Sequence, residues 1–286
     1  MPKASCTFFP EQLRQQIRKQ APNPEPVETS LGWWLNQSWE TLREQVFPPG
    51  LKRSWFVLSS GSCPSCQKSV PMYDWEIDVF AYPWKVRCPH CNQRFPTNDF
   101  QAYYRSGFDA QGIFRPHLAD QTLLVDERGG SFGVDDGNGY KDEEGNCWLF
   151  IAAYLVHGHW TGFLIPGLTA LASGYLRTGD QNYSRRALIL LYRISQFFPD
   201  YNWRSQGVMY EETGRQDGYV GYWALTSNDL PTLALTYDMV FESMEDPILL
   251  DFLGVDSYTL QQSIESRIFE DALAHIDGVV PAVVSL

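Results

Sequence analysis

Two Cys-x-x-Cys pairs constrain this chain more than any other feature of its sequence. The first spans residues 63–66 (CPSC) and the second residues 88–91 (CPHC), with 21 residues between them. Each short turn directs two thiolates the same way, so two such turns supply the corners of a tetrahedral metal site. We therefore expect one Zn²⁺ bound by Cys63, Cys66, Cys88 and Cys91. Two disulfides or a redox pair are the alternatives.

The two turns are copies of each other. Residues 63–71 and 88–96 share both cysteines, both prolines and the apolar residue before the second proline. His90 lies inside the second turn, where a site of four cysteines leaves it no vacancy. Four protein ligands leave no open position for water or substrate, so such a site is structural. The expected zinc ion explains how this region is held together and does not name a reaction.

Composition narrows the class of protein. With 286 residues the chain has room for one large domain or two smaller ones. Its ten Trp, 15 Tyr and 17 Phe suit an aromatic core or a cleft that stacks on sugar rings. The 34 acidic and 22 basic residues give a net charge of -12, which argues against nucleic acid as a partner. The longest apolar run, residues 148–156, is too short to span a bilayer, and the N-terminus shows no signal-peptide pattern.

Helical periodicity dominates the sequence outside the cysteine turns. Apolar spacing predicts helices over residues 11–19, 38–46, 165–177, 181–198, 229–243 and 260–276. Gly179 is expected to end one of them and Asp180 to cap the next, while the glycine-rich segment 157–162 is expected to interrupt the helical pattern. Antiparallel helix pairs joined by short turns form an array of α/α hairpins, closed or open.

Three stretches follow from these patterns. Residues 1–54 are expected to form an N-terminal helical arm and linker, and residues 55–135 a cysteine-turn module with short strands and loops. Residues 136–286 are expected to form the α/α-hairpin domain. The predicted fold is therefore mainly α, with a small zinc-ribbon-like β insertion near the N-terminus.

Several blocks of the sequence resemble one known family. They are residues 84–91 (WKVRCPHC), 95–100 (FPTNDF), 103–107 (YYRSG), 135–140 (DDGNGY) and 175–183 (YLRTGDQNY). This series resembles the heparinase II/III-like polysaccharide lyases over roughly residues 55 to 275. The block around the second cysteine turn is fairly specific, whereas several α/α-toroid sugar enzymes share the last block.

The resemblance implies an α/α toroid followed by β-sandwich domains, and β-elimination on a uronic-acid polysaccharide. In that reaction one group neutralises the uronate carboxylate, a His or Tyr base removes the C5 proton, and an acid, typically Tyr, protonates the leaving oxygen. This chain ends where the family's Asn- and His-containing segment would follow. We therefore expect a partial toroid, either inactive alone or completed by a second chain. The family implies a periplasmic or secreted location.

No catalytic residue carries over on a motif match, so the candidates rest on chemistry. His157 and His159 flank a glycine beside Trp160, and imidazoles handle protons near neutral pH. Tyr140 is the third catalytic candidate. The candidates for binding an acidic polysaccharide are Trp160, Tyr219, Tyr222, Trp223, Arg115 and His117. For each of these side chains, ordinary packing or a place in a surface turn is the alternative.

Two other functions fit the same residues. A glycoside hydrolase would need two carboxylates, for which Asp135, Asp136, Asp217 and Asp229 are available. A non-catalytic helical module stabilised by zinc would bind carbohydrate or protein without turnover. Residues 134–140 (VDDGNGY) contain the first two carboxylates and suit either a calcium loop or a turn. We favour the turn because the closing Glu of an EF-hand is missing.

Overall fold

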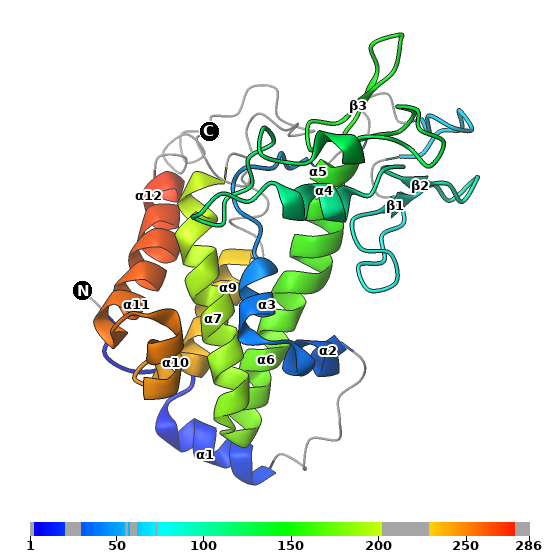
Figure 1. The fold of residues 1–286 in the computed structure, drawn as a ribbon. Helices are drawn as coiled ribbons and strands as arrows, with labels where there is room; N and C mark the ends of the chain where they lie inside the picture. Colours follow the sequence, from blue (N-terminus) through cyan, green and yellow to red (C-terminus); the bar gives the residue numbers. More distant parts are fainter. Residues whose placement is uncertain are drawn as a thin grey trace. The chain divides into compact units, whose positions relative to one another are not determined.

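The computed structural model of the protein describes residues 3–20, 30–54, 57, 62–71, 74–201 and 229–277. Within these ranges the chain is mainly helical, with two short two-stranded sheets (Figure 1). The predicted mainly α class is confirmed. None of the helices in these ranges combines the length and the apolar character needed to cross a membrane.

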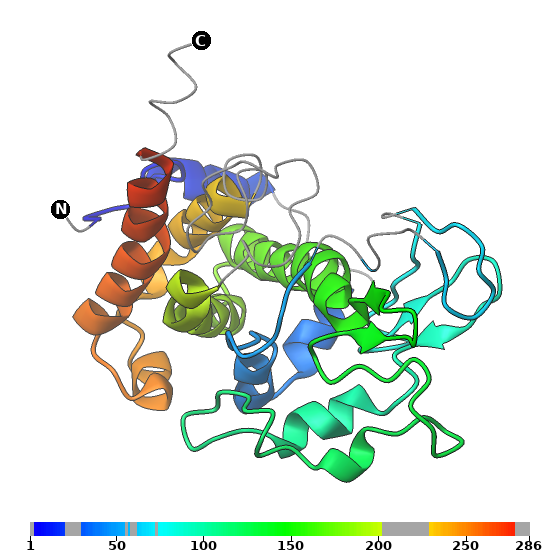
Figure 2. The same ribbon diagram turned by 90° about the horizontal axis from the view of Figure 1, so that it is seen from above.

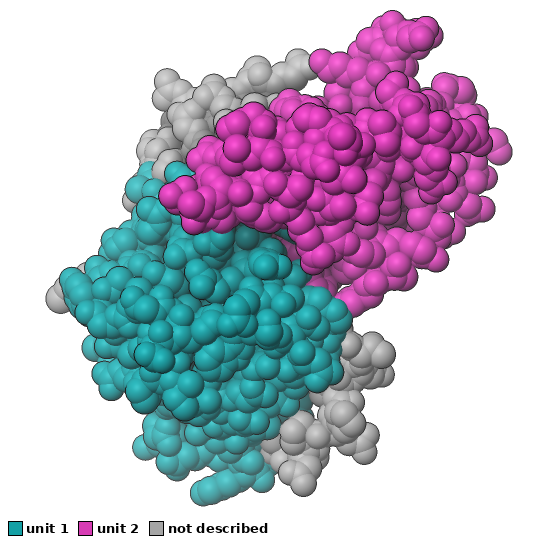
Figure 3. All heavy atoms as spheres, viewed as in Figure 1, with its two compact units in different colours: residues 1–47, 164–201, 219–286 teal, residues 48–163, 202–218 magenta. Residues whose placement is uncertain are grey.

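The chain divides into two compact units (Figure 3). Unit 1 comprises Met1–Phe47, Leu164–Tyr201 and Tyr219–Leu286. Unit 2 comprises Pro48–Phe163 and Asn202–Gly218. Each unit is thus assembled from segments that are separated in the sequence. The division into contiguous stretches at residues 54 and 135 stays a prediction.

Unit 1 contains a helical hairpin made of α6 (Ile165–Thr178) and α7 (Gln181–Phe197). Gly179 ends α6 in the left-handed conformation, with φ of 74°, and its amide donates to the Tyr175 carbonyl at 2.7 Å. The Asp180 side chain then accepts from the Asn182 amide at 2.9 Å and caps α7. The two helices therefore lie side by side and antiparallel (Figures 1 and 2).

The other helices of unit 1 in the described ranges are short. They are α1 (Glu11–Gln20), α2 (Ser30–Asn36), α3 (Trp39–Glu44), η3 (Phe198–Asp200), α9 (Leu230–Val240), η6 (Phe241–Ser243), α10 (Pro247–Leu253), α11 (Ser257–Ile264), η7 (Glu265–Glu270) and α12 (Asp271–Asp277). Helix α6 packs against α1, α2, α7 and α9, and α7 also contacts α3 and α11. Gly167 lets α2 approach closely, because a Cβ there would lie 2.1 Å from Nε1 of Trp34.

Unit 2 is built from short elements around aromatic side chains. They are β1 (Val86–Arg87) paired with β2 (Arg94–Phe95), β3 (Tyr140–Lys141) paired with β4 (Cys147–Trp148), α4 (Phe100–Ser106), η1 (Gln121–Leu123) and α5 (Phe150–Ala153). Phe95 stacks on Phe150 at 4.6 Å between ring centroids, and the Trp84 ring lies 4.8 Å from that of Tyr104. These rings are buried, so part of the aromatic richness serves the core.

Residues Tyr154–Leu164 form a π-helix, η2, between α5 and α6. The predicted interruption of the helical pattern at residues 157–162 is therefore wrong. Gly158 has a packing role instead, because a Cβ there would lie 2.3 Å from Cγ2 of Ile77. Gly158 thus lets the Ile77 side chain pack closely against a helix that is not interrupted. A π-helix of this length is rare.

Candidate metal centre

The two cysteine turns of unit 2 have the same backbone structure. In the first turn the Cys63 amide donates to the Lys68 carbonyl at 2.9 Å, and the Gln67 amide donates to the Cys63 carbonyl at 2.9 Å. In the second turn Cys88 bonds to Gln93 and Asn92 bonds to Cys88 in the same pattern, both at 3.0 Å. The fourth residue after each leading cysteine is left-handed, with φ of 58° at Gln67 and 60° at Asn92. The sequence repeat is therefore a structural repeat.

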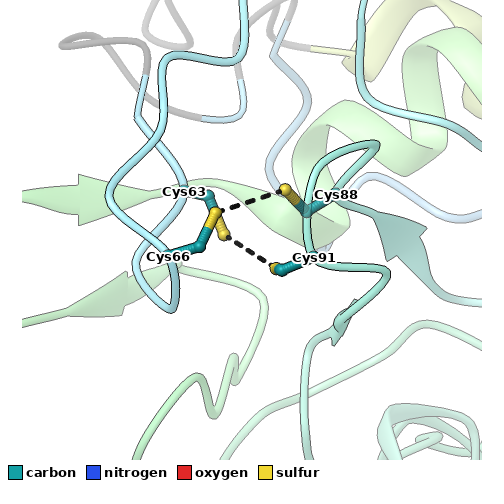
Figure 4. A group of neighbouring side chains, drawn as sticks. All are labelled: Cys63, Cys66, Cys88 and Cys91. Carbon is teal, nitrogen blue, oxygen red and sulfur yellow. Dashed lines mark hydrogen bonds between the residues drawn. The ribbon is translucent and has the colours of Figure 1, made fainter.

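The four thiols converge on one point between the two turns (Figure 4). The Sγ atoms of Cys63 and Cys91 are 3.8 Å apart, those of Cys66 and Cys88 are 3.9 Å apart, and all four lie within 4.8 Å of one another. A tetrahedron with Zn–S bonds of about 2.3 Å has edges of about 3.8 Å. A disulfide would need about 2.05 Å, and all four cysteines are free. The residues therefore fit a metal ion.

The environment of the thiols differs from one cysteine to the next. Burial raises the pKa of the Cys63 and Cys91 thiols above the ordinary value. The Lys68 amide, as a hydrogen-bond donor, lowers the pKa of Cys66. A cation at the centre would stabilise all four thiolates, because metal coordination deprotonates a thiol outright.

The two turns are anchored to each other and to the core. Val70 and Phe95 occupy equivalent positions after the turns, and both are buried. His90 Nε2 forms a hydrogen bond of 2.9 Å with the Ser69 carbonyl, so the second turn contacts the strand-like end of the first. His90 therefore lies outside the cluster of thiols, as the sequence predicted.

Asp135 is a buried acceptor that organises the loop before α5. Its Oδ1 accepts from the amides of Gly137 at 2.7 Å and Gly139 at 2.9 Å, and its Oδ2 accepts from the Ile151 amide at 3.1 Å. Burial raises the pKa of Asp135 to about 6, while these amides oppose the shift. Both carboxylate oxygens thus accept hydrogen bonds from backbone amides, which is the arrangement of a turn. In a calcium loop these oxygens would face the ion instead.

Asn98 joins residues 95–100 to residues 135–140. Its Oδ1 accepts from the Asp135 amide at 3.1 Å, and its Nδ2 donates to the Asp135 carbonyl at 3.2 Å. Both residues are buried. The next residue, Asp99, caps α4 by accepting from the Ala102 amide at 3.0 Å. Residues 95–100 and 135–140 therefore form one polar hub inside unit 2.

The two candidate catalytic histidines and Trp160 all lie on η2. His159 is buried, with its ring centroid 5.3 Å from that of Phe163. Burial, and to a lesser extent the charge of Arg53, lowers the pKa of His159 to about 3. At neutral pH this imidazole is uncharged and a poor match for a general base. His157 is half-buried and Trp160 is buried.

The remaining candidates lie on other elements. Tyr140 is half-buried on β3, where its ring packs 5.5 Å from that of Trp148, and burial raises its pKa. Arg115 is engaged by Asp109, with 2.8 Å between Nε and Oδ2, and His117 is exposed in the same loop. Tyr219, Tyr222, Trp223 and Asp217 lie outside the described residues.

One groove in unit 2 was not predicted from the sequence. It has a volume of about 380 Å³ and is lined by Glu76, Ile77, Asp78, Tyr82, Lys85, Val86, Arg87 and Arg94. A comparison of the two cysteine turns could have indicated it. Arg87 and Arg94 are paired across the second turn, at the positions that Ser62 and Ser69 occupy in the first. The two arginines are therefore an addition specific to the second copy of the turn.

Together, the described fold and the converging thiols define a mainly helical protein with a candidate four-cysteine metal centre. Comparisons with protein-family models, with curated proteins and with solved structures each find no match for this chain.

Proposed function

We propose that Cys63, Cys66, Cys88 and Cys91 bind one Zn²⁺ and that this ion is structural. The observation that supports the proposal is the pair of sulfur–sulfur distances across the two turns, 3.8 and 3.9 Å, which equal the edges of a zinc tetrathiolate. Zn²⁺ is not redox-active, so the site needs no electron donor or acceptor. Four protein ligands leave no coordination position open to water. The chemistry supplied by the ion is the neutralisation of thiolate charge, and it holds the two turns together.

The test is the metal content of the full chain purified under reducing conditions. We expect one zinc ion per chain, and substitution by Co²⁺ should give the absorption of a tetrahedral tetrathiolate site. A tetrahedral site of four sulfurs also suits iron, so a coloured protein containing iron would overturn the choice of zinc. A chain with all four thiols free and no bound metal would overturn the site.

We propose further that the chain is related to the heparinase II/III-like polysaccharide lyases and binds a uronic-acid-containing polysaccharide. The resemblance of five sequence blocks supports this proposal. Two of the blocks form the hub of Asn98 and Asp135, and a third forms the junction of α6 and α7 at Gly179. A partial α/α toroid of helical hairpins is the architecture that goes with this proposal.

If the chain is catalytic, the reaction is β-elimination. A base would remove the C5 proton of the uronate, and an acid would protonate the leaving oxygen. His157 is the better candidate base of the two histidines, because His159 is buried and its pKa is about 3. Tyr140, the third catalytic candidate, would then be the acid. Asp135 is a weak candidate for glycoside hydrolysis, because both of its oxygens accept from backbone amides.

The test is incubation of the zinc-bound full chain with heparin-like polymers and with alginate. Elimination produces an unsaturated uronate, which absorbs in the ultraviolet, and the His157→Ala variant should lose this signal. Hydrolysis would give new reducing ends without that absorption. Absence of any ultraviolet increase across the polymers would overturn catalysis for this chain.

Binding without turnover is the second candidate function. It is favoured by the neutral, buried state of His159 and by the packing of the Tyr140 ring on Trp148. A polysaccharide affinity measured by calorimetry, with no product formed, would support this alternative. Absence of affinity for every acidic polymer would overturn polysaccharide binding altogether.

A further inference from the structure

The groove of unit 2 contains three basic side chains, and two of them are already satisfied. Lys85 Nζ donates to the Asn98 carbonyl at 2.7 Å and also to the Pro96 carbonyl. Arg87 forms an ion pair with Glu76 and donates from Nη1 to Oδ1 of Asn92 at 2.9 Å. These two cations therefore have protein partners and position the walls of the groove.

Arg94 is different. Its guanidinium carbon lies 3.6 Å from the centroid of the Tyr82 ring, which holds the guanidinium by a cation–π contact. Its Nε is buried and has no hydrogen-bond acceptor in the part of the chain that the structure describes. A guanidinium without an acceptor at a buried Nε is costly, since charged donors in proteins are normally satisfied. The terminal nitrogens Nη1 and Nη2 make no hydrogen bond or ion pair with the residues that the structure describes, so these two donors are the ones that a ligand oxygen can reach.

The acidic side chains of the groove do not compete for Arg94. Glu76 is paired with Arg87, and Asp78 accepts from the amides of Phe80 at 3.1 Å and Ala81 at 2.9 Å. The groove thus carries three basic and two acidic side chains in a chain whose net charge is -12. The local charge of the groove therefore favours the binding of an anion, although the net charge of the chain is negative.

The chemistry of Arg94 selects the kind of anion. A planar guanidinium offers two parallel N–H donors, which match the two oxygens of a carboxylate in a bidentate pair. The apolar side chains of Ile77 and Val86 line the same groove. The groove volume of about 380 Å³ falls at the small end of the range of ligand pockets, roughly 300 to 1,000 Å³. This combination suits one carboxylated ring or chain segment.

We propose that this groove binds a carboxylate and that Arg94 is its direct partner. The inference rests on the proposed polysaccharide function only for the source of the carboxylate, which is then a uronic-acid residue. The site lies in the second cysteine turn, since Arg94 follows Cys91 by three residues. The metal centre and the binding groove therefore share one segment of chain, and a bound metal fixes the backbone that carries Arg94.

The experiment uses the zinc-bound full chain and calorimetric titration with three probes, which are an oligouronate, acetate and sulfate. The variants are Arg94→Gln, Arg94→Lys and the control Arg128→Gln, which removes the same charge from an exposed side chain of unit 2. We expect Arg94→Gln to weaken oligouronate and acetate binding by about tenfold to a hundredfold. Arg94→Lys should weaken binding less, and Arg128→Gln should bind like the unsubstituted chain. Zinc content and the unfolding midpoint check that each variant is folded.

The outcomes separate this inference from the proposed function. Oligouronate binding that is unchanged in Arg94→Gln overturns the groove as the site and leaves polysaccharide binding intact. Acetate binding that depends on Arg94, without any affinity for oligouronates, supports the carboxylate site and overturns the polysaccharide function. Binding of sulfate alone, or of none of the three probes, overturns the carboxylate site. If Arg94→Gln loses its zinc, Arg94→Met takes its place, because it also removes the charge and the donors, and the same comparisons then apply.

Discussion

Arg14 in α1 donates a hydrogen bond of 2.8 Å from Nη2 to the main-chain carbonyl of Asp238, 224 residues further along the chain. The Arg14 side chain is fully buried. Nη2 also donates to the Met239 carbonyl at 2.9 Å, Nε donates to the Phe9 carbonyl at 2.7 Å, and Nη1 donates to a carboxylate oxygen of Glu242 at 3.0 Å. A buried cation thus joins α1 to the C-terminal end of α9 within unit 1.

The Asp238 carboxylate makes the reciprocal connection. It accepts from the amides of Thr7 at 2.7 Å, Phe8 at 3.0 Å and Phe9 at 2.9 Å, and it forms an ion pair with Lys3. Desolvation opposes ionisation of Asp238, but the hydrogen bonds from Lys3 and these amides outweigh it and lower its pKa. Two sets of hydrogen bonds therefore hold residues 3–20 against α9, one made by the Arg14 guanidinium and one by the Asp238 carboxylate.

We predict that Arg14→Met destabilises the protein by about 3 to 5 kcal/mol, because three carbonyls and part of the Glu242 carboxylate lose a buried donor. The measurement is urea unfolding at neutral pH. Arg18→Met is the matched control on the same helix. The Arg18 side chain is partly exposed and lies 3.7 Å from Glu242, so its loss should cost less than about 1 kcal/mol. Equal effects of the two substitutions would contradict the network.

We predict that Cys91→Ser removes the metal and destabilises unit 2, because three thiolates hold zinc far less tightly than four. The apparent binding energy of a structural zinc ion is on the order of 10 kcal/mol in small domains, so the loss should exceed the effect of an ordinary substitution. Zinc content and thermal unfolding measure the two consequences. The control is Cys147→Ser, which removes a half-buried thiol outside the cluster and should retain one zinc ion. Retention of zinc by Cys91→Ser would refute the four-cysteine site.

The left-handed residues in the two turns give a third prediction. Gln67→Val and Asn92→Val should each cost about 1 to 2 kcal/mol, since a β-branched residue is strained at φ near 60°. The part of each cost that comes from backbone strain should be similar, because the two turns have the same backbone hydrogen bonds. Chelator competition measures the accompanying loss of zinc affinity. Gln93→Val, an exposed neighbour without a positive φ, should have little effect, and a cost as large as that of Asn92→Val would argue against backbone strain.

The sequence predicted the parts of the fold that depend on local signals. The helix junction at Gly179 and Asp180 is one of these, and the convergence of the four cysteines is another. Both depend on a few residues with a fixed spacing. Helix α2 (Ser30–Asn36) was missed because seven residues are too few to show a period, and its place depends on the packing of Trp34 against Gly167.

Other features could not be predicted because they depend on residues far apart in the sequence. The sequence predicted a helix interruption around Gly158, whereas this glycine lies within η2 and makes room for Ile77. The partnership of Arg14 with Asp238 has no local signature, and neither has the stacking of Arg94 on Tyr82. For the site, the spacing therefore predicted the metal ligands, but it did not predict the burial of His159, which determines the protonation of that side chain.

The burial of His159 leads to a pH dependence of stability. Its pKa is about 3 in the folded protein, against about 6.5 when unfolded, so the unfolded state takes up a proton first as the pH falls. The stability contributed by neutral His159 is complete above about pH 6.5 and is lost as the pH falls towards 3. Between pH 7 and pH 5 the loss should be about 2 kcal/mol. His159→Gln, which stays neutral, should lack this part of the slope.

The measurement is urea unfolding of both proteins at several pH values, with the free energies subtracted at each pH. Asp135 acts in the opposite direction, because its pKa is raised to about 6 and its stabilising contribution is lost as the pH rises through that value. That contribution, and any release of zinc by acid, occurs in both proteins and cancels in the difference. Parallel pH profiles would mean that His159 takes up its proton at an ordinary pH in the folded protein. In that case its imidazole would regain its place as a candidate base beside His157.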